Sequence, residues 1–510
     1  MKPVSNGSDG DSLDRRVTLN SIALWIRVVV TAITTLLSTR FALQALGIEQ
    51  FGVYIAVTAI PLILSFPTGA LLVSTQRALN IELDQSRLPS IFSALFGLHF
   101  IAGILILIVG GILGYLALNN LAQIPDANER TALWVFQLKL LGVVIGTMLI
   151  PYEALYQNKE QFVLLSALEI LRSCFVMAGA YWLLSYEGDA LMMYAGIVVA
   201  GTIMTNLVIS STAIIRYPES RPKRKHAFQL DIYKTQLRLS SWSMIGGFAS
   251  VSKSHGMALM TNFFFGPAGS AAFGVASQIA GAARQLVTSV ITVLTPRILK
   301  AESQSGRAEM IDLGFRTAKY VSLVTLGICI PIMIELSTIF EIWLTDIPEL
   351  AVATTVILLI VLIIDQCSAS LGVSHLATGE IAKYQTICGT MTILTVPIAY
   401  LIGQQFDDQV VMLSALVVMT IIVVIQRVVL LNAHITKPLQ LWFQITLSPS
   451  LKVFGVAALA AIVVSMTMSP DLVRFAITFT LLPTFILLTI LVLGLSASER
   501  KSLFLSRSST

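Results

Sequence analysis

The sequence predicts an all-α polytopic membrane protein with about 14 transmembrane helices, arranged as two parallel six-helix lobes plus two extra C-terminal helices. Three observations support this fold class. The 510 residues are 55% hydrophobic with a mean hydropathy of +0.82, and 12% are charged, whereas a soluble domain carries about 25% charged residues. Apolar runs long enough to cross a bilayer recur along the whole chain. Finally, a short charged phrase occurs twice, as TQRALNIE from Thr75 and TPRILKAE from Thr295.

Each apolar segment is expected to be a helix, because only helices satisfy their own backbone in lipid when the alternation of a barrel is missing. The loops between the segments are mostly short. The predicted spans have the approximate limits 18–43, 51–73, 89–117, 131–156, 162–185, 189–215, 239–265, 268–295, 315–340, 350–374, 383–402, 409–432, 451–468 and 474–496.

The placement of basic residues predicts the orientation. If the N-terminus is cytoplasmic, most of the 33 Lys and Arg residues fall in cytoplasmic segments, and the outer loops hold only Arg130 and Arg474. The positive-inside rule therefore places both termini in the cytoplasm. No small-residue cleavage pattern closes the first apolar run, so it is interpreted as an uncleaved first span and not as a signal peptide.

The repeated phrase marks an internal repeat. ALGIEQFGVYIAV (45–57) joins spans one and two, FFGPAGSAAFGVASQI (264–279) joins spans seven and eight, and in each a glycine precedes FGV. An even number of spans per repeat makes the copies parallel, an arrangement typical of transporters with a substrate site at the interface between halves. The predicted domains are an N-terminal six-helix lobe (1–216), a basic cytoplasmic linker (217–238), a C-terminal six-helix lobe (239–436), and two additional helices with a cytoplasmic tail (437–510). The basic linker is expected to lie near anionic headgroups rather than to bind nucleic acid.

Nothing in the sequence indicates catalysis, a cofactor or a metal site. The four cysteines lie inside apolar segments without a CxxC pair, which indicates neither a disulfide framework nor a zinc site. GFASVSKS (247–254) lacks the glycine before the lysine that a phosphate-binding loop needs, and no strand precedes it. No loop is large enough for a catalytic domain, so the protein is predicted not to be an enzyme.

Buried charges are the main functional signal. Six cations are expected within spans and a seventh near the end of span twelve, against three deep acids. A central Arg or Lys costs roughly 2.5–3.5 kcal/mol on insertion, so each should face a partner or a wet cavity. Because the acids can neutralise at most half of the six, the remaining positive charge is expected to face water or an anionic ligand. The cations are Arg27, Arg40, Lys139, Arg172, Lys253, Arg284 and Arg427, and the acids are Glu169, Glu335 and Asp365.

Helical spacing predicts a cationic substrate-binding cavity between the halves. Arg27, Lys253 and Arg284 each lie on a polar stripe of their span, in spans one, seven and eight. Lys139 and Arg40 are further candidates for this cavity. The same cations could instead make structural bonds between helices, and Arg40 could extend to the outer headgroups.

Asp365, Glu169 and His255 are the candidates for coupling to an ion gradient, with H⁺ or Na⁺ as the coupling ion. Asp365 is a lone mid-span acid. Glu169 lies three residues before Arg172, a spacing that also allows an intrahelical pair. On a regular helix His255 points roughly 200° away from Lys253, and it could simply be a packed histidine.

The run STRFALQALGIEQFGVY, the TQR phrase, and IPYEALYQNKEQF (150–162) with its weaker echo SHLATGEIAKYQ (374–385) resemble the polysaccharide transporter (Wzx-type flippase) family. This family belongs to the multidrug/oligosaccharidyl-lipid/polysaccharide (MOP) exporter superfamily. The resemblance implies a V-shaped, MATE-like pair of lobes around a central cavity. It also implies ion-coupled, alternating-access flipping of undecaprenyl-diphosphate-linked oligosaccharide (an O-antigen, capsule or exopolysaccharide repeat unit) across the bacterial cytoplasmic membrane. Only Arg27, Lys253 and Arg284 carry over as cavity residues.

The leading prediction is therefore a lipid-linked oligosaccharide flippase of the inner membrane. Its expected partners are the polyprenyl-diphosphate-linked glycan, membrane lipids and the polysaccharide polymerase and export machinery, and not nucleic acid. The alternative is a multidrug or small-solute antiporter of the same fold. Such a cavity should be acidic or aromatic to attract cationic drugs, whereas the intramembrane charges here are mostly cations.

Overall fold

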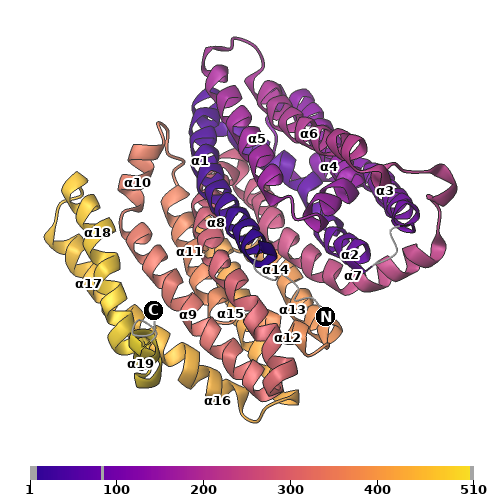
Figure 1. Cartoon of the computed structure of the whole chain (residues 1–510). Helices are drawn as coiled ribbons and strands as arrows, with labels where there is room; N and C mark the ends of the chain where they lie inside the picture. The colour runs from indigo at the N-terminus through magenta and orange to yellow at the C-terminus, as the bar shows by residue number, and fades with distance from the viewer. Residues whose placement is uncertain (1–7, 82–85, 506–510) are drawn as a thin grey trace, which may run out of the picture. The chain divides into compact units, whose positions relative to one another are not determined.

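The structure is a computed structural model that describes residues 8–81 and 86–505. Within these ranges the regular elements are all helices and no strand occurs. The chain forms two compact units, Met1–Ala271 and Ala272–Thr510. Each unit is described below by itself, and Figure 1 labels the helices of both.

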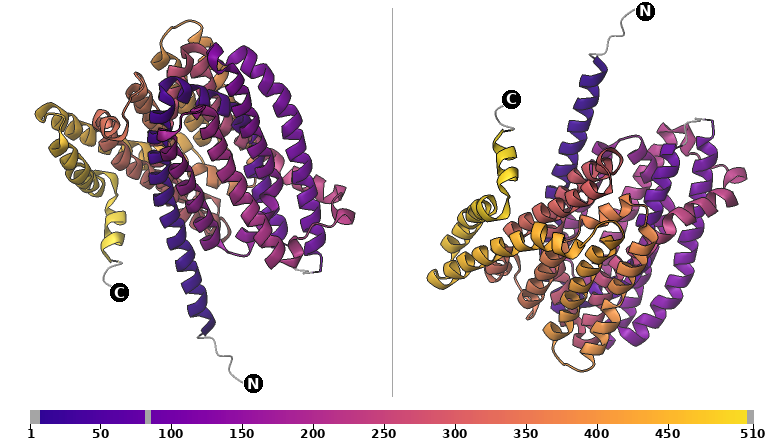
Figure 2. Two further views of the ribbon diagram at one scale, coloured as in Figure 1. Left: turned by 90° about the horizontal axis from the view of Figure 1, so that it is seen from above. Right: turned by 90° about the horizontal axis from the view of Figure 1, so that it is seen from below.

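Unit 1 is a bundle built around α1. Within it, α1 packs along α5 and α4, α4 also contacts α3 and α6, and α2 packs against α7. The N-terminal turns of α1, indigo in Figure 2, project beyond the other helices of this unit. The helices are α1 (Ser8–Leu64), α2 (Pro67–Ile81), α3 (Leu88–Leu121), α4 (Glu129–Asn158), α5 (Phe162–Trp182), α6 (Ala190–Arg216), α7 (Leu230–Val251), a π-helical turn (Ser252–Gly256) and the first part of α8 (Met257–Ser305).

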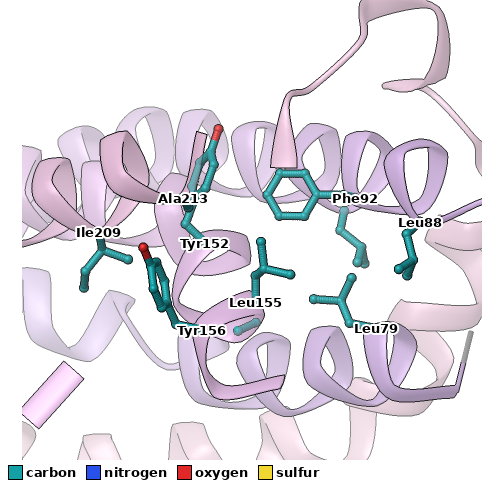
Figure 3. Packing of buried hydrophobic residues seen from close by; sticks show 10 residues of the cluster. Leu79, Leu88, Phe92, Tyr152, Leu155, Tyr156, Ile209 and Ala213 are labelled. Carbon is teal, nitrogen blue, oxygen red and sulfur yellow. The ribbon is translucent and has the colours of Figure 1, made fainter. Parts of the chain in front are cut away.

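The motif IPYEALYQN at the end of α4 forms one side of a buried apolar cluster (Figure 3). Tyr152, Leu155 and Tyr156 share one helix face by their spacing and meet Phe92 of α3, whose ring centroid lies 5.2 Å from that of Tyr152. The Tyr156 hydroxyl donates to Thr212 Oγ1 of α6 at 2.9 Å. This packing fixes the rotation of α4 about its own axis. The adjacent face of α4 can therefore carry polar residues.

The two joints predicted from the repeat have the same local backbone. α1 is bent at Gly47 (φ 71°) and α8 at Gly266 (φ 65°), a left-handed region that glycine enters at little cost. The joints also touch each other inside unit 1, where Ser270 Oγ donates to the Gly52 carbonyl at 2.9 Å. A Cβ at Gly52 would lie 1.8 Å from the Pro267 carbonyl oxygen, so only glycine permits this approach.

Unit 2 contains the rest of α8 and a second bundle. Here α11 packs against α15 and α9, and α17 and α18 pack against α9. The helices are α9 (Arg307–Ile334), α10 (Leu336–Trp343), α11 (Ala351–Gln366), α12 (Leu371–Ala377), α13 (Ile381–Ile393), α14 (Thr395–Gly403), α15 (Gln409–Val429), α16 (Pro438–Trp442), α17 (Ser448–Thr467), α18 (Leu472–Thr489) and α19 (Ala497–Leu505). The axes of α11 and α12 differ by 42° across a short break.

The predicted all-α, multi-pass membrane architecture is confirmed. The described residues contain 11 helices that are long and apolar enough to cross a membrane, or 12 if α11 and α12 form one bent span. Two of them, Ile22–Ile81 and Ser240–Glu302, have 60 and 63 residues, whereas one crossing needs about 20. Each contains one of the glycine joints, so each supplies two crossings, which accounts for the predicted total of about 14.

The structure differs from the predicted span limits at the end of α9 and at the helix that begins at Pro438. The predicted span 315–340 is interrupted at Glu335, where α9 ends and α10 begins. The helix predicted to start at 451 starts at Pro438 and continues to Thr467, because proline suits the first helical turn and the following segment is largely apolar. The phrase TQRALNIE ends at Glu82, which lies outside the described residues.

The C-terminal helix α19 is tied to α9 by a carboxylate. Both Glu499 oxygens accept from Lys319 Nζ at 2.6 Å, and Oε1 also accepts from the Tyr320 hydroxyl at 2.7 Å. The Ser496 amide donates to Oε2 at 2.7 Å. Burial alone would raise the pKa of Glu499, but these hydrogen bonds outweigh it and lower the pKa to about 2.

This carboxylate predicts an acid-sensitive attachment of α19. The folded-state pKa lies below the ordinary value of 4.5, so the stabilisation is fully present above that value and is lost as the pH falls toward about 2. We expect the Tm of the wild type to exceed that of Glu499→Gln at about pH 6, and the difference to shrink by about pH 3. Thermal melting in detergent measures it, and a difference that stays constant with pH would contradict the assignment.

Candidate functional site

A polar cavity of about 340 Å³ lies inside unit 1, among α1, α4, α5 and α6. Its charged lining residues are Arg27, Glu153, Glu169 and Arg172, and its neutral polar lining residues are Gln157, Thr202, Thr205 and Asn206. Each of the four helices contributes at least one polar side chain. The cavity therefore offers both hydrogen-bond donors and acceptors within the membrane-spanning part of the unit.

Arg27 enters this cavity from α1. The predicted polar stripe of α1 faces α5 at Thr34, whose hydroxyl lies 2.7 Å from Ser173 Oγ. Among the described residues, no hydrogen bond or ion pair engages the Arg27 guanidinium. Because an arginine carries five donors and is always charged, this side chain is well suited to bind an anion or a polar ligand.

The carboxylates of the cavity differ in their partners. Glu169 forms an intrahelical ion pair with Arg172, with a 3.2 Å hydrogen bond from Arg172 Nε and a second contact from Nη2. The local pair considered from the i, i+3 spacing is thus present, and Glu169 still lines the cavity. Glu153, which the sequence did not single out, accepts from Gln157 Nε2 at 2.9 Å. The sequence signal that could have identified Glu153 is its position next to Tyr152, on the polar side of a motif whose other face is apolar and buried.

Lys253 and His255 lie in the π-helical turn Ser252–Gly256 between α7 and α8. The angle of roughly 200° expected for a regular helix does not apply unchanged here, because a π turn alters the spacing of successive side chains. Single π turns inside α-helices occur frequently at functional sites. Lys139 of α4 is half-buried and lies within electrostatic range of Arg172 and of His255.

Arg40 is half-buried and lies on α1 beyond Arg27, toward the Gly47 joint. It is not among the residues that line the unit 1 cavity. The structure thus groups the predicted residues of unit 1 into a cavity with Arg27 and Glu169 and a neighbouring set with Lys139 and His255. Arg40 lies apart from that cavity.

Unit 2 brings three charged residues together from three helices. Asp365 Oδ1 of α11 accepts from Arg427 Nη1 of α15 at 2.9 Å, and Asp365 Oδ2 lies 3.4 Å from Arg284 Nη1 of α8. Arg427 Nη1 also lies 3.3 Å from Ser368 Oγ. The side chains of Arg427 and Asp365 are 16% and 17% exposed, whereas Arg284 is 49% exposed. We call Arg284, Asp365 and Arg427 the charge triad.

The triad lies beside the break between α11 and α12, where Asp365 occupies the last turn of α11. The backbone groups freed by such a break need other partners inside a membrane. Trp442 Nε1 donates to the Cys367 carbonyl at 2.9 Å. His375 Nε2 lies 2.8 Å from the Arg427 carbonyl oxygen, and the His375 ring stacks on Tyr384 at 4.7 Å. The break is therefore supported by its neighbours and places an acid where the helix changes direction.

Two arginines have roles that the sequence did not predict. Arg427 was placed near the end of span twelve without a partner, and it makes the shortest contact of the triad. Arg474 was predicted in an outer loop, which is wrong: it lies in the first turn of α18 and is 7% exposed. Its Nε and Nη2 donate to the two carboxylate oxygens of Glu335, at 2.9 and 3.0 Å. The deep acid Glu335 is therefore not a counter-ion for the other intramembrane cations.

No family model and no curated protein matches this sequence. Solved structures do match it. The lipid II flippase MurJ in an inward closed conformation superimposes with a TM-score of 0.62 at 14% identity, covering 93% of this chain and 98% of MurJ. The MATE multidrug transporter DinF-BH gives 0.59 at 14% identity, covering 85% and 98%. A MOP superfamily transporter from Pyrococcus furiosus gives 0.58 at 14% identity, covering 83% and 96%. The chain therefore has the fold of the MOP superfamily transporters, which MATE transporters and MurJ share.

Proposed function

We propose that the chain is a transporter that flips a polyprenyl-diphosphate-linked oligosaccharide across the bacterial cytoplasmic membrane by alternating access. The observation that carries this proposal is the charge triad, in which two guanidiniums share one carboxylate. The three groups together bear one net positive charge, and Arg284 is half exposed. Arginine binds phosphate oxygens through paired N–H donors, so two neighbouring arginines suit a diphosphate.

The position of the triad fits such a ligand. Irregular backbone at membrane depth is tolerated where it lines a cavity or is buried in protein, and broken helices carry the binding sites of many transporters. Charge attraction strengthens as the effective dielectric falls, so a partly dry site can offset the lost hydration of a diphosphate. Asp365 lies beside the helix break that follows Gln366, and this supports a binding role for the triad.

The unit 1 cavity, taken by itself, has a lining that suits a sugar. Its lining combines two guanidiniums, two carboxylates, two amides and two threonine hydroxyls. A sugar presents hydroxyl groups that both donate and accept, and a mixed lining of this kind can satisfy them. Arg27 and Glu153, which lack an ion pair with each other in the described structure, are the side chains we assign to this contact.

The other parts of the proposal follow the sequence. We propose an inner-membrane location with cytoplasmic termini, a two-lobe repeat over 1–216 and 239–436, and coupling to H⁺ or Na⁺. Polysaccharide polymerase or export machinery is the expected protein partner. That MurJ, a structure with the same fold, is a lipid II flippase supports a lipid-linked substrate.

A second candidate is a multidrug or small-solute antiporter. Glu153 and Glu169 in the unit 1 cavity favour it, because carboxylates attract cationic solutes, and solved MATE multidrug transporters share the fold. The two functions differ in the charge of the cargo. Loss of Arg284 should harm a flippase of anionic lipids and spare an exporter of cations that uses the unit 1 cavity.

Arg284→Gln is therefore expected to reduce surface polysaccharide by about tenfold, since a hydrogen bond to a charged group contributes about 1.5–3 kcal/mol and 1.4 kcal/mol corresponds to a factor of ten. The measurement is the amount of surface polysaccharide in cells that carry the variant as their sole copy, with membrane abundance determined in parallel. Arg130→Gln, a change at an exposed residue in the first turn of α4, is the matched control and should leave the amount unchanged. Normal polysaccharide with Arg284→Gln would contradict the proposed site.

A further inference from the structure

We infer that Asp365 is an internal counter-ion, which occupies Arg284 and Arg427 in the empty carrier and exchanges with the phosphate oxygens of the ligand. The inference rests on the proposed function and deepens it, because it states how the anion is captured and how it leaves. It assigns Asp365 a positioning role for the two arginines and a direct part in ligand release.

The two halves of the triad are unequal. The Arg427 contact is 2.9 Å long and both of its side chains are largely buried, with Ser368 Oγ as a further neighbour of Arg427. The Arg284 contact is 3.4 Å long, near the limit of a hydrogen bond, and Arg284 is 49% exposed. Arg427 is therefore the fixed anchor of the site, and Arg284 is the arm that can turn to an incoming anion.

Neighbouring side chains hold Arg427 in place. The sequence on either side of it, VVIQRVVLL, contains no acidic residue. The Arg427 carbonyl oxygen lies 2.8 Å from His375 Nε2, and Tyr384 and Cys388 of α13 lie within electrostatic range of its guanidinium. Tyrosine and cysteine side chains are ordinarily neutral at pH 7. Asp365 is thus the anionic group that an incoming diphosphate meets at these two guanidiniums.

The helix break gives Asp365 room to move. Asp365 lies two residues before the turn that separates α11 from α12. Hinges are commonly formed by a few residues at the ends of helices or strands. The break itself is held at its first residue by Trp442, which donates to the Cys367 carbonyl, and at its last residue by Ser370 Oγ, which donates to the Gly314 carbonyl at 3.0 Å. A change in the last turn of α11 can therefore withdraw the carboxylate while α12 stays in place.

An internal anion solves two physical problems of an arginine-based carrier. Two unpaired guanidiniums are costly inside a membrane protein when no ligand is bound. Two unpaired guanidiniums would also bind a diphosphate too tightly to release it, whereas transport requires binding that is weak enough for the ligand to leave the site. A carboxylate that returns to the arginines reduces both effects. If the Asp365 carboxylate occupies the two arginines about nine-tenths of the time, the apparent affinity for the diphosphate falls about tenfold.

The experiment is equilibrium binding to the purified full-length protein in detergent. Two probes separate the sources of diphosphate: inorganic pyrophosphate for a soluble anion and farnesyl diphosphate for a polyprenyl headgroup. Asp365→Asn and Asp365→Ser both remove the charge, so a variant that fails to fold does not end the test. Asp312→Asn is the matched control, because Asp312 pairs with Arg316 on α9, outside the triad.

We expect both Asp365 variants to bind farnesyl diphosphate about tenfold more tightly than the wild type, and Asp312→Asn to bind it like the wild type. The same gain for pyrophosphate would show that the headgroup alone is recognised, and a gain for farnesyl diphosphate only would show that the lipid is required. We also expect Asp365→Asn to produce less surface polysaccharide despite its tighter binding, a separation that a purely structural role does not give.

Equal or weaker binding by the folded Asp365 variants would overturn the inference while leaving the proposed function standing, provided the wild type binds a probe and Arg284→Gln does not. Failure of the wild type and every variant to bind either probe would overturn the proposed function, and the inference with it.

Discussion

Replacing Glu335 with glutamine is expected to lower the free energy of unfolding by about 3–5 kcal/mol. Glu335 is fully buried and receives two hydrogen bonds from Arg474 and one of 2.8 Å from Thr478. The substitution leaves a buried guanidinium without its counter-charge, which is among the most costly changes in a protein interior. It also loosens α18 from the junction of α9 and α10. Thermal or denaturant-induced unfolding of the purified protein in detergent measures the effect.

Glu302→Gln is the matched control for this prediction. Glu302 contacts Arg307 at 3.4 Å, and the Arg307 side chain is 51% exposed, so the change should cost less than about 1 kcal/mol. A third variant isolates the cause: replacing both Glu335 and Arg474 with leucine removes the stranded charge and should recover part of the stability. Equal stability of Glu335→Gln and the wild type would show that the pair does not hold α18.

Replacing Gly52 with alanine is expected to destabilise the protein by about 3 kcal/mol or more. The added methyl would lie 1.8 Å from the carbonyl oxygen of Pro267 and 2.5 Å from its carbonyl carbon. These are backbone atoms, which cannot rotate away as a flexible side chain can, so the joint of α1 must separate from the joint of α8. The loss of the hydrogen bond from Ser270 Oγ to the Gly52 carbonyl adds to the cost. Tm and the yield of monodisperse protein after detergent extraction are the measurements.

Gly69→Ala is the control for the joint. No atom lies within 4 Å of a Cβ at Gly69, and alanine favours a helix over glycine by about 1 kcal/mol. We therefore expect this variant to be as stable as the wild type or slightly more stable. If Gly52→Ala were equally stable, the close approach of the two repeat joints would be wrong.

The fold could be predicted from the sequence because two physical constraints act along the chain itself. Bilayer thickness sets the length of each apolar run, and insertion into the membrane restricts the placement of Lys and Arg. The repeat was recognised from its doubled phrase and from the glycine before FGV at each joint, and in the structure Gly47 and Gly266 share a positive φ. Breaks inside the spans were not predicted. The interruption at Glu335 and the 42° bend after Gln366 depend on packing and on hydrogen bonds to distant residues.

The candidate site was predicted only in part, because pairing between helices leaves no local signal. Arg284 and Asp365 were both singled out, but they are 81 residues apart, and Arg427 is 62 residues from Asp365. Hydropathy and helical spacing gave no reason to place them together. The misplacement of Arg474 has a local cause. Asp471 caps α18 by accepting from the Arg474 amide at 2.8 Å, so the helix starts before Arg474, at a position that an N-cap search would have identified.

We propose that this protein moves a diphosphate-linked glycan lipid across the cytoplasmic membrane. This proposal is tested most directly by measuring which leaflet holds undecaprenyl-diphosphate-linked oligosaccharide in cells that lack the protein. We expect the lipid to accumulate in the cytoplasmic leaflet, to reach the outer leaflet when the wild type is supplied, and to remain inside when Arg284→Gln is supplied at the same abundance. The same distribution between leaflets with and without the protein would contradict the account.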